Sequence, residues 1–419
     1  MPPPIEPPEP DAHPALAAAW AALDEAAVDW AVLRGSGLGD EDEADVLVRP
    51  RDLARATTAL AGAAFPRIPA IGHGRHRFHR TYHGPTDRWL TIDVVDALGF
   101  GPGGALGLDG VVDPMLDRRR RSPVPARLDP DDGFWALLLH DLLDRRDTPA
   151  AHRAQVAAFA ASARADGPLG SAIDRLGSPG AAAGLIERVR AGDEIGARRL
   201  GHALGRAWRR RSLIAVTRRR LAQAVLRRLR KPHTALRRRG IDVAVLGPDG
   251  AGKSSVAAAL VATLPIPTRT VYLGLYAAGL EGSGRAAFGR RLARLWRGWL
   301  AGGWHRLRGR IVVYDRHALD SALRSRTGSR RRRIRRAVLA HAIPAPALIV
   351  VLDAPGEILH ERSGEHDADT LETQRHGYLE LATRRRNVVV VNATGDADGV
   401  RRAVTSRIWE RYRDGIARG

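Results

Sequence analysis

The sequence predicts an α/β protein whose two main parts are joined by helices, and three observations point to this class. From Ile241 onward, short apolar runs alternate with helical stretches, which is the pattern of a parallel five-stranded sheet with flanking helices. A glycine-rich loop follows the first of these runs and leads directly into a helix. The first 128 residues mix helix-like and strand-like runs, as is typical of an α+β domain.

Shifts in composition divide the chain into four segments. Residues 1–14 are rich in proline, and we expect them to be disordered. Residues 15–128 form the expected α+β domain. Residues 129–236 are rich in alanine, leucine and arginine and predict helices, separated by Gly-Ser-Pro turns and ending in a basic linker helix. Residues 237–419 form the expected parallel α/β domain.

Composition excludes several classes of protein. The chain has 419 residues, of which 44% are hydrophobic and 27% are charged, so we expect a globular protein. It has no cysteine, which excludes disulfide scaffolds, thiolate zinc sites and cysteine nucleophiles. No apolar run approaches the roughly 20 residues that span a bilayer, and the start lacks the basic and apolar regions of a secretory signal. The expected location is therefore the cytoplasm.

Positive charge is concentrated in one segment. The formal net charge is +21, and residues 206–239 hold fourteen Arg or Lys with no Asp or Glu, so this segment carries most of the excess. Apolar residues at helical spacing predict a helix here that breaks at Pro232. Three interpretations stay open: a solvated linker helix, a patch for nucleic acid or an anionic membrane, and a surface for an acidic partner.

The strongest chemical motif is the glycine-rich loop between an apolar strand and a helix. Glycines let successive backbone N–H groups turn inward, and the helix N-terminus adds its dipole. The ammonium group of Lys253 supplies a compact positive charge for the β- and γ-phosphates of a nucleotide, and Ser254 offers a hydroxyl to Mg²⁺. The predicted nucleotide-binding residues are Gly247, Pro248, Asp249, Gly250, Ala251, Gly252, Lys253, Ser254 and Ser255.

Further apolar runs predict the other strands, at residues 270–273, 311–314, 347–352 and 387–391, with a closing helix at 397–412. The second of these runs is followed by Asp315 and Arg316. A carboxylate at the end of a strand beside the loop suits Mg²⁺, and the adjacent arginine suits an acceptor phosphate. A surface ion pair explains an Asp-Arg pair equally well when the pair is taken alone.

Four motifs of the C-terminal domain occur in a characteristic order. They are the loop 247–255, the segment from Tyr314 to His317 with Ser321 after it, the strand end 351–355 with Arg362 after it, and residues 372–381 with Gln374 and Tyr378. In this combination residues 241–419 resemble the thymidylate-kinase family of P-loop kinases. The resemblance implies ATP and Mg²⁺ as cofactors, and phosphoryl transfer to a nucleotide or another small phosphorylated or hydroxyl acceptor.

The resemblance also implies roles for single residues. Lys253 would contact the donor phosphates, and Ser254 and Asp315 would contact the metal ion. Arg316 would contact the acceptor. Arg362, at the start of a mobile lid, would stabilise the transferred group.

Two segments depart from that family, so the acceptor stays open. The lid at residues 363–370 is short and acidic, and residues 273–310 hold nothing that matches a thymine pocket. Within the second segment, apolar residues recur at helical spacing with arginines around them: Leu292, Leu295, Trp296, Trp299, Leu300 and Leu307. This helix packs on the sheet, lies on anionic lipid, or grips the substrate. Residues 330–336, nearly all arginine, form a solvated face or hold a polyphosphorylated substrate.

The N-terminal domain carries a second set of carboxylates. A strand near residue 30 leads to a Gly-Ser turn at 35–36, and Glu43 and Asp45 lie at alternate positions of the next strand, so they share a face. With Asp93 on a third strand they can hold two Mg²⁺ ions for nucleotidyl transfer. Residues 15–127 resemble the nucleotidyltransferase fold, with Glu43 at the position of that fold's first Asp. The alternative is a degenerate domain that only binds or positions a ligand.

Four histidines lie close together in the same domain, at positions 73, 76, 79 and 83. Their spacing fits a metal site on a helix, but the glycine and arginine residues between them favour a loop. The histidines therefore predict no metal site.

Three functional hypotheses follow from the sequence. The first is an ATP-dependent kinase of small molecules. The second is a kinase that binds nucleic acid or processes its ends and uses the basic segment 206–239. The third is a scaffold that binds ATP without turnover. A homodimer is compatible with each of them.

Overall fold

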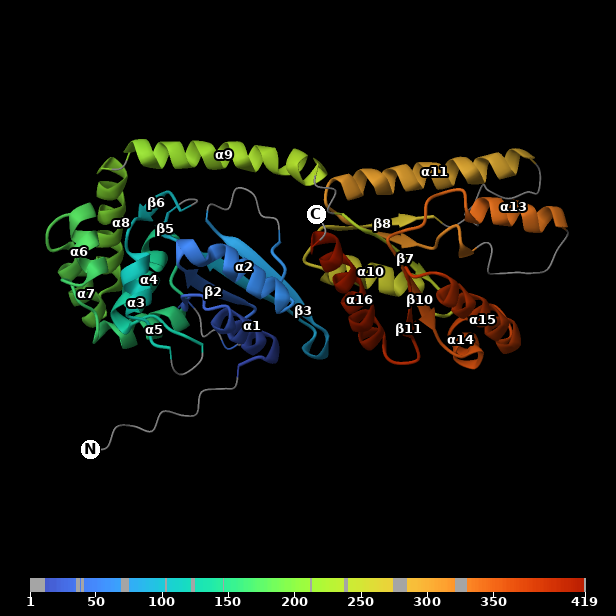
Figure 1. Ribbon diagram of the computed structural model, residues 1–419, viewed down its shortest axis with the longest axis horizontal. Helices are drawn as coiled ribbons and strands as arrows, with labels where there is room; N and C mark the ends of the chain where they lie inside the picture. The colour runs from blue at the N-terminus through green and yellow to red at the C-terminus, as the bar shows by residue number, and fades with distance from the viewer. Residues whose placement is uncertain are drawn as a thin grey trace, which may run out of the picture. The chain divides into compact units, whose positions relative to one another are not determined.

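The computed structural model divides the chain into two compact units (Figure 1). The first comprises residues 1–83 and 88–230, and the second comprises residues 84–87 and 231–419. The structure describes residues 12–34, 38, 41–68, 75–101, 104–121, 125–145, 147–211, 213–236, 240–273, 285–320 and 330–417, without the side chains of 230–236, 330–333, 336 and 417.

The second unit is built on a five-stranded sheet in which all strand pairs are parallel, in the order β11-β10-β7-β9-β8. The strands are β7 (Asp242–Leu246), β8 (Thr268–Tyr272), β9 (Ile311–Asp315), β10 (Leu348–Asp353) and β11 (Val388–Asn392). The predicted α/β class, with five parallel strands, is confirmed. Because β7 is the middle strand, the carboxyl ends of β9 and β10 lie on either side of the glycine-rich loop.

Helices cover both faces of this sheet (Figure 1). On one face, α10 (Lys253–Thr263) and α16 (Ala397–Ala417) contact the strands and each other. On the other face lie α11 (Arg285–Leu307) and α15 (Ala368–Arg384), with α13 (Arg330–Ala340) against α11 and α14 (Gly356–Ser363) against α15.

Double-sided coverage explains why β7 is apolar at every position after its first residue. Ala244 and Leu246 share a core with Leu295 of α11. Val243 and Val245, at the alternate positions, face the opposite side and are buried there. A strand buried on both faces has no solvent-facing positions for polar residues.

Two glycines let α11 approach the sheet closely. A Cβ atom at Gly298 would lie 2.4 Å from Cδ2 of Leu273, and a Cβ atom at Gly302 would lie 2.3 Å from the hydroxyl oxygen of Tyr314. Both distances are shorter than real Cβ contacts, so a larger residue at either position would have to displace the side chain of Leu273 or Tyr314. The face of α11 that carries Gly298 and Gly302 is therefore its inner face.

Replacing Gly302 by alanine tests this contact. We expect Gly302→Ala to lower the free energy of unfolding of the second unit by about 1–3 kcal/mol, because the added methyl group overpacks the contact with Tyr314. Gly289→Ala in the same helix is the matched control, since nothing lies within 4 Å of its Cβ position. The higher helix propensity of alanine should make that variant more stable, by up to about 1 kcal/mol. Differential scanning calorimetry measures both effects, and equal transition temperatures would contradict the close packing.

The first unit contains a four-stranded sheet of mixed direction, in the order β1-β2-β4-β3. Its strands are β1 (Trp30–Arg34), β2 (Glu43–Val48), β3 (Arg77–His83) and β4 (Arg88–Val95). β2 and β4 are parallel, whereas β1 pairs antiparallel with β2 and β3 pairs antiparallel with β4. One face of the sheet packs on α1 (Pro14–Glu25) and α2 (Leu53–Gly62), and a short 3-10 turn at Pro50–Asp52 precedes α2. The 3-10 turn at Gly84–Thr86, between β3 and β4, is counted with the second unit.

The remaining helices of the first unit share a core with the other face of this sheet. A hairpin of β5 (Leu98–Phe100) and β6 (Leu106–Leu108) leads into α3 (Val112–Asp117), α4 (Pro130–Leu143), α5 (Ala150–Ala160), α6 (Pro168–Leu176), α7 (Ala181–Arg190) and α8 (Glu194–Arg211). Phe134, Trp135 and Trp208 are buried in one cluster with Ala31 and Leu33 of β1. The helical region is therefore packed onto the sheet.

Two expectations about local structure are wrong. The histidine-rich stretch is not a loop from residue 77 onward, because it pairs with β4 along its whole length as β3. Pro232 does not end the basic helix, because α9 (Leu213–Leu236) continues past it. Only about one turn of helix follows the proline, so the missing amide donor costs the helix a single ladder hydrogen bond.

The beginning of α9 packs on the first unit. Val216 is buried in the core that also contains Trp208, and Arg219 lies 3.7 Å from Asp109. From residue 220 to residue 229 the side chains are exposed or half-buried. None of the helices in the described ranges is long and apolar enough to cross a membrane.

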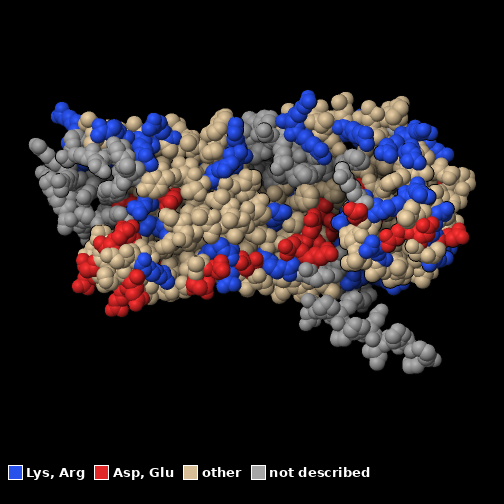
Figure 2. Space-filling view, turned by 180° about the vertical axis from the view of Figure 1, so that it is seen from behind, with Lys and Arg blue, Asp and Glu red and all other residues tan. Residues whose placement is uncertain are grey.

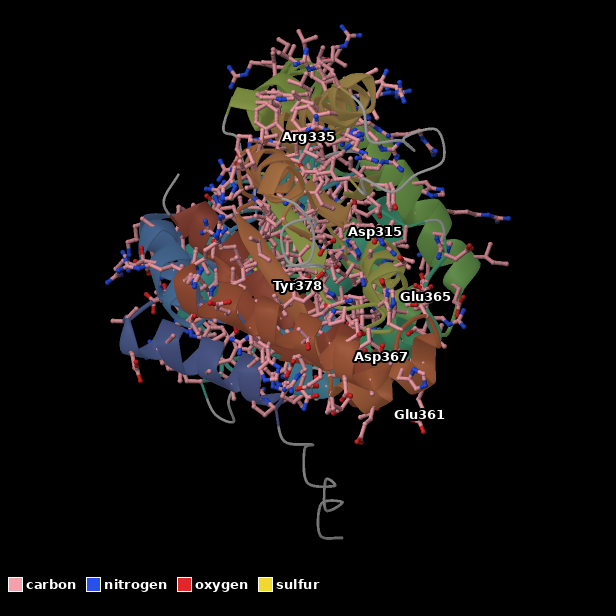
Figure 3. All side chains as sticks on the ribbon, turned by 90° about the vertical axis from the view of Figure 1, so that its right-hand side faces the viewer. Asp315, Arg335, Glu361, Glu365, Asp367 and Tyr378 are labelled. Carbon is pink, nitrogen blue, oxygen red and sulfur yellow. The ribbon has the colours of Figure 1, made fainter. Side chains whose placement is uncertain are left out.

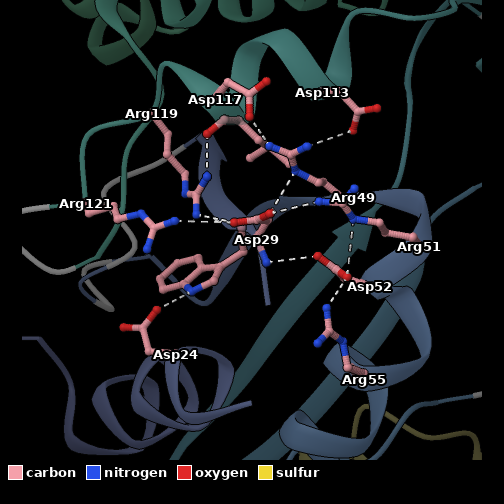
Figure 4. Close-up of polar contacts among 12 residues, drawn as sticks. Asp24, Asp29, Arg49, Arg51, Asp52, Arg55, Asp113, Asp117, Arg119 and Arg121 are labelled. Carbon is pink, nitrogen blue, oxygen red and sulfur yellow. Dashed lines mark hydrogen bonds and ion pairs between the residues drawn. The ribbon is translucent and has the colours of Figure 1, made fainter. Parts of the chain in front are cut away.

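A network of ion pairs ties the turn before β1 to the segment around α3 (Figure 4). The carboxylate of Asp29 accepts a hydrogen bond from Arg119 at 2.5 Å and forms an ion pair with Arg49 at 3.0 Å, and Arg49 also pairs with Asp117. Burial alone would raise the pKa of Asp29, but the hydrogen bond from Arg119 and the charges of Arg49 and Arg121 outweigh it and lower the pKa. The network is a structural clamp within the first unit.

Candidate functional site

The glycine-rich loop joins the middle strand of the second unit to α10. It ends at Gly252, whose left-handed backbone (φ 83°) begins the helix without a side-chain cap. The first N–H groups of a helix have no acceptor within it, and together with the helix dipole they bind anions. The predicted nucleotide-binding loop, residues 247–255, therefore presents an uncapped helix N-terminus at the carboxyl edge of the sheet.

Gly250 allows this loop to lie close to α14. Its φ is 87°, and a Cβ atom there would come within 2.4 Å of the carbonyl oxygen of Leu359. A side chain would clash with the backbone of α14, which cannot move aside easily. The requirement for glycine at this position is thus both conformational and steric.

Lys253 is buried within the loop. Its Nζ atom donates to the carbonyl oxygens of Gly247 at 3.0 Å and Pro248 at 2.7 Å, and it lies 3.5 Å from the carboxylate of Asp249. The same carboxylate lies 3.6 Å from the guanidinium of Arg316. A phosphate at the helix N-terminus would compete with these oxygens for both cations, because it carries more negative charge.

Ser254 and Asp315 meet although they lie 61 positions apart in the chain. The Ser254 hydroxyl, in the first turn of α10, lies 3.1 Å and 3.3 Å from the two carboxylate oxygens of Asp315. Parallel pairing of β9 with β7 sets Asp315 opposite Val245, one residue before the end of β7. Hydroxyl and carboxylate oxygens are ligands that Mg²⁺ accepts, so the two predicted metal ligands are brought together.

Arg316 has an unusual backbone directly after that carboxylate. Its φ is 68°, in the left-handed region that residues other than glycine rarely adopt. Such conformations persist where the surrounding structure holds them and are frequent at functional sites. The turn brings the guanidinium toward Asp249 of the loop.

In this structure the Arg362 side chain is hydrogen-bonded to backbone carbonyl groups. It does not reach toward a position for the transferred group. Its guanidinium donates to the carbonyl oxygens of Ala393 at 2.7 Å and Thr394 at 3.2 Å. These residues follow β11, so the side chain anchors α14 to the loop after the last strand.

The predicted lid is a short turn between α14, which ends at Ser363, and α15, which begins at Ala368. Figure 3 shows Glu361, Glu365 and Asp367 on the surface around this turn. Asp367 caps α15, and the hydrogen bond from the Thr370 amide lowers the pKa of that carboxyl. Part of the acidic character of the turn is therefore explained by helix capping.

Sequence reasoning missed Arg375. This guanidinium donates to both carboxylate oxygens of Asp353, at 2.6 Å and 3.1 Å, and to Glu372 at 2.7 Å. Glu372 in turn accepts from the amide of Gly356 at 2.9 Å, and this hydrogen bond lowers its pKa. The network clamps the starts of α14 and α15 to the end of β10. In the sequence, the feature that could have indicated this network is a Glu and an Arg three positions apart, which places them on one face of a helix.

α15 is also tied to the segment that follows β9. The hydroxyl of Tyr378 donates to Asp320 at 2.8 Å, and both side chains are buried. Gln374 is buried one turn earlier, and its Oε1 atom has no hydrogen-bond partner among the described residues. Ser321, the next residue of the predicted motif, lies outside the described residues.

The three carboxylates of the first unit converge. One oxygen of each of Glu43, Asp45 and Asp93 lies within 4.8 Å of the others. Asp45 stands opposite Asp93 on the parallel strands β2 and β4, and Glu43 shares the face of Asp45 because it is two positions away. Burial and the charges of Asp45 and Asp93 raise the pKa of Glu43. A divalent cation would relieve this repulsion.

Two basic side chains that the sequence did not assign to this cluster contact it. A β-bulge between Val32 and Arg34 shifts the register, so Arg34 turns to the carboxylate face and donates to Asp45 at 2.6 Å. The Nδ1 atom of His76 lies 2.5 Å from Asp93, and this hydrogen bond raises the pKa of the imidazole.

A cleft of about 360 Å³ opens over the cluster. His140 of α4, Arg145 just after α4 and His152 of α5 line it together with the carboxylates. Gly35 and Ser36, the predicted Gly-Ser turn, lie outside the described residues.

The other histidines of that stretch form no metal group with these carboxylates in the described ranges. His79 is buried in the sheet, and its Nδ1 atom lies 3.1 Å from the carbonyl oxygen of Phe65. Burial lowers the pKa of His79 to about 4. The residue therefore stays neutral at pH 7 as part of the core, and His73 lies outside the described residues.

The low pKa of His79 predicts a loss of stability in acid. Below its ordinary pKa of about 6.5 the unfolded chain takes up a proton on this residue, whereas the folded protein does so only near pH 4. Stability should therefore fall as the pH decreases from 6.5 to 4, by up to about 3 kcal/mol. Urea denaturation at pH 7 and pH 5 measures the difference. The leucine of His79→Leu cannot titrate, so this variant should show a smaller difference in stability between pH 7 and pH 5. An unchanged pH dependence would contradict the low pKa of His79.

A scan against models of known protein families finds no match for this chain, and a search of curated proteins finds no similar sequence.

Proposed function

We propose that the second unit transfers a phosphoryl group from Mg-ATP to a small acceptor, in the manner of a thymidylate-kinase-like P-loop kinase. The observation that carries the proposal is the contact between Ser254 and Asp315 beside the uncapped N-terminus of α10. An anion-binding helix end alone would accept any phosphate. The adjacent pair of metal ligands favours a magnesium-bound triphosphate.

The donor side of the site fits a triphosphate. The backbone amides at the start of α10 would bind its phosphate oxygens, and the Lys253 ammonium would exchange its carbonyl partners for the β- and γ-phosphates. Ser254 and Asp315 would hold Mg²⁺, which when bound neutralises the charge that develops during transfer. Asp249, close to Lys253 and Arg316, would keep both cations oriented.

Arg316 is the best-placed residue for the acceptor. It follows the metal ligand Asp315, and its planar guanidinium can bind a phosphate through two parallel hydrogen bonds. The acceptor would thus be a nucleotide or another phosphorylated metabolite, held in line with the donor. Catalysis would depend on positioning and charge neutralisation, with no covalent enzyme intermediate.

Lys253→Ala tests this proposal. We expect phosphoryl transfer to fall by at least about a hundredfold, because a preorganised charge on the transferred group is lost. Lys231→Ala is the matched control, since Lys231 is the only other lysine of the chain. The full-length protein is screened with Mg-ATP against nucleoside monophosphates, nucleosides, sugars and amino sugars. Circular dichroism checks the fold, and undiminished transfer by a folded Lys253→Ala protein would contradict the assignment.

A second candidate function is favoured by the carboxylate cluster of the first unit. Three carboxylates within 4.8 Å, below a cleft, are suited to metal-dependent nucleotidyl transfer. Arg34 and His76 orient two of the carboxylates and would do so around a metal ion.

Removal of one carboxylate tests this second function. Asp93→Asn should weaken Mn²⁺ binding by about tenfold or more, because a metal ligand is lost. Electron paramagnetic resonance titrations measure Mn²⁺ binding. They are done without nucleotide and in proteins that also carry Asp315→Asn, so that the second unit does not contribute to the measured binding. Asp42→Asn is the matched control, because that exposed carboxylate pairs with Arg88 and lies outside the cluster. Equal Mn²⁺ affinity of the Asp93→Asn protein and the control protein would contradict the proposed metal site.

A further inference from the structure

Helix α11 turns an apolar surface away from the sheet. Its inner face is the one with Gly298 and Gly302. On the opposite side, the exposed fractions of four large apolar side chains are 42% for Trp296, 58% for Leu300, 55% for Trp304 and 38% for Leu307. With 100° between successive residues, these four lie within a sector of about 80°. We call them the α11 stripe.

Small and basic residues surround the α11 stripe. Ala286, Gly289 and Ala293 continue the same sector toward the start of the helix, and all three are exposed. Arg290 and Arg297 are exposed along one border. The guanidinium of Arg308 lies 4.4 Å from the ring centroid of Trp304 at the far end. The surface is thus an apolar strip with a cationic margin.

The charged residues of α11 and α13 have a single sign. α11 contains six arginines and no Asp or Glu, and the same holds for α13, which packs against it and exposes Ile334 and Val338. Figure 2 shows basic side chains as blue patches along this edge of the second unit. A partner must therefore offer negative charge at its surface and an apolar layer within reach of the tryptophans.

An anionic lipid bilayer meets both conditions better than a second copy of the chain or a nucleic acid does. A second copy of the chain would bring two arginine-rich helices together without an acidic residue on either. A nucleic acid would neutralise the arginines but would leave Leu300 and Leu307 in water. In a bilayer, tryptophan prefers the headgroup boundary, leucine reaches the acyl chains, and arginine binds anionic headgroups.

We propose that the α11 stripe binds the surface of an anionic phospholipid bilayer, with α11 lying in the plane of the interface. This binding is independent of the proposed kinase activity, because none of its residues belongs to the loop or to the Ser254–Asp315 contact. It would place the second unit on a membrane without a spanning helix.

Vesicle binding by the full-length protein tests the proposal. The probes are vesicles of phosphatidylcholine and phosphatidylglycerol in equal amounts, with vesicles of phosphatidylcholine alone for comparison. A Trp296→Ser, Leu300→Ser, Trp304→Ser variant keeps every charge and replaces exposed residues, so its fold should be retained. We expect it to bind the anionic vesicles at least about tenfold more weakly than the unchanged protein, because binding scales with buried apolar area.

The matched control is Val261→Ser with Val390→Ser, two residues of the second unit that are each 39% exposed and lie outside α11. It should bind like the unchanged protein. Equal binding of all three proteins would show that arginines alone hold the lipid, and would overturn the role of the stripe. If the unchanged protein binds no vesicle, the proposal fails. Sedimentation velocity and an oligonucleotide titration would then show whether a second copy or a nucleic acid covers the stripe.

Discussion

Parallel pairing of β9 with β7 is the constraint on which the second unit depends. Parallel strands end at the same edge of a sheet, so the loop after β7 and the carboxylate at the end of β9 must be neighbours. The register determines that Asp315, and not Tyr314 one position earlier, reaches Ser254. Helices on both faces hold that register, because they bury the alternate apolar residues of each strand.

The first unit uses a parallel strand pair in another way. In the second unit polar groups lie where strands end, whereas Glu43, Asp45 and Asp93 lie on the face of β2 and β4. Carboxylates on a sheet face repel one another, and in this molecule the basic side chains of Arg34 and His76 contact two of them. Arg34 reaches them only through a bulge, which moves a side chain from one face of the sheet to the other.

α11 has two apolar faces, one packed on the sheet and one exposed. Its sequence places tryptophans and leucines around about half of the helix circumference, so periodicity does not say which of them face the sheet. The decision comes from Gly298 and Gly302, which allow close approach on one side only. Leu295 is consequently buried, while Trp296, its neighbour in sequence, faces outward.

The sequence by itself determined the features that are local in the chain: the strand-loop-helix around Lys253, the apolar runs of the parallel strands, and the alternation that puts Glu43 and Asp45 on one face. These follow from backbone geometry over a few residues. Only the tertiary structure decided the strand order, the clamp of Arg375 on Asp353, the backbone partners of Arg362 and the contact of His76 with Asp93. Each of these joins segments that are distant in sequence, and their meeting depends on strand register and helix packing, which no short stretch of sequence specifies.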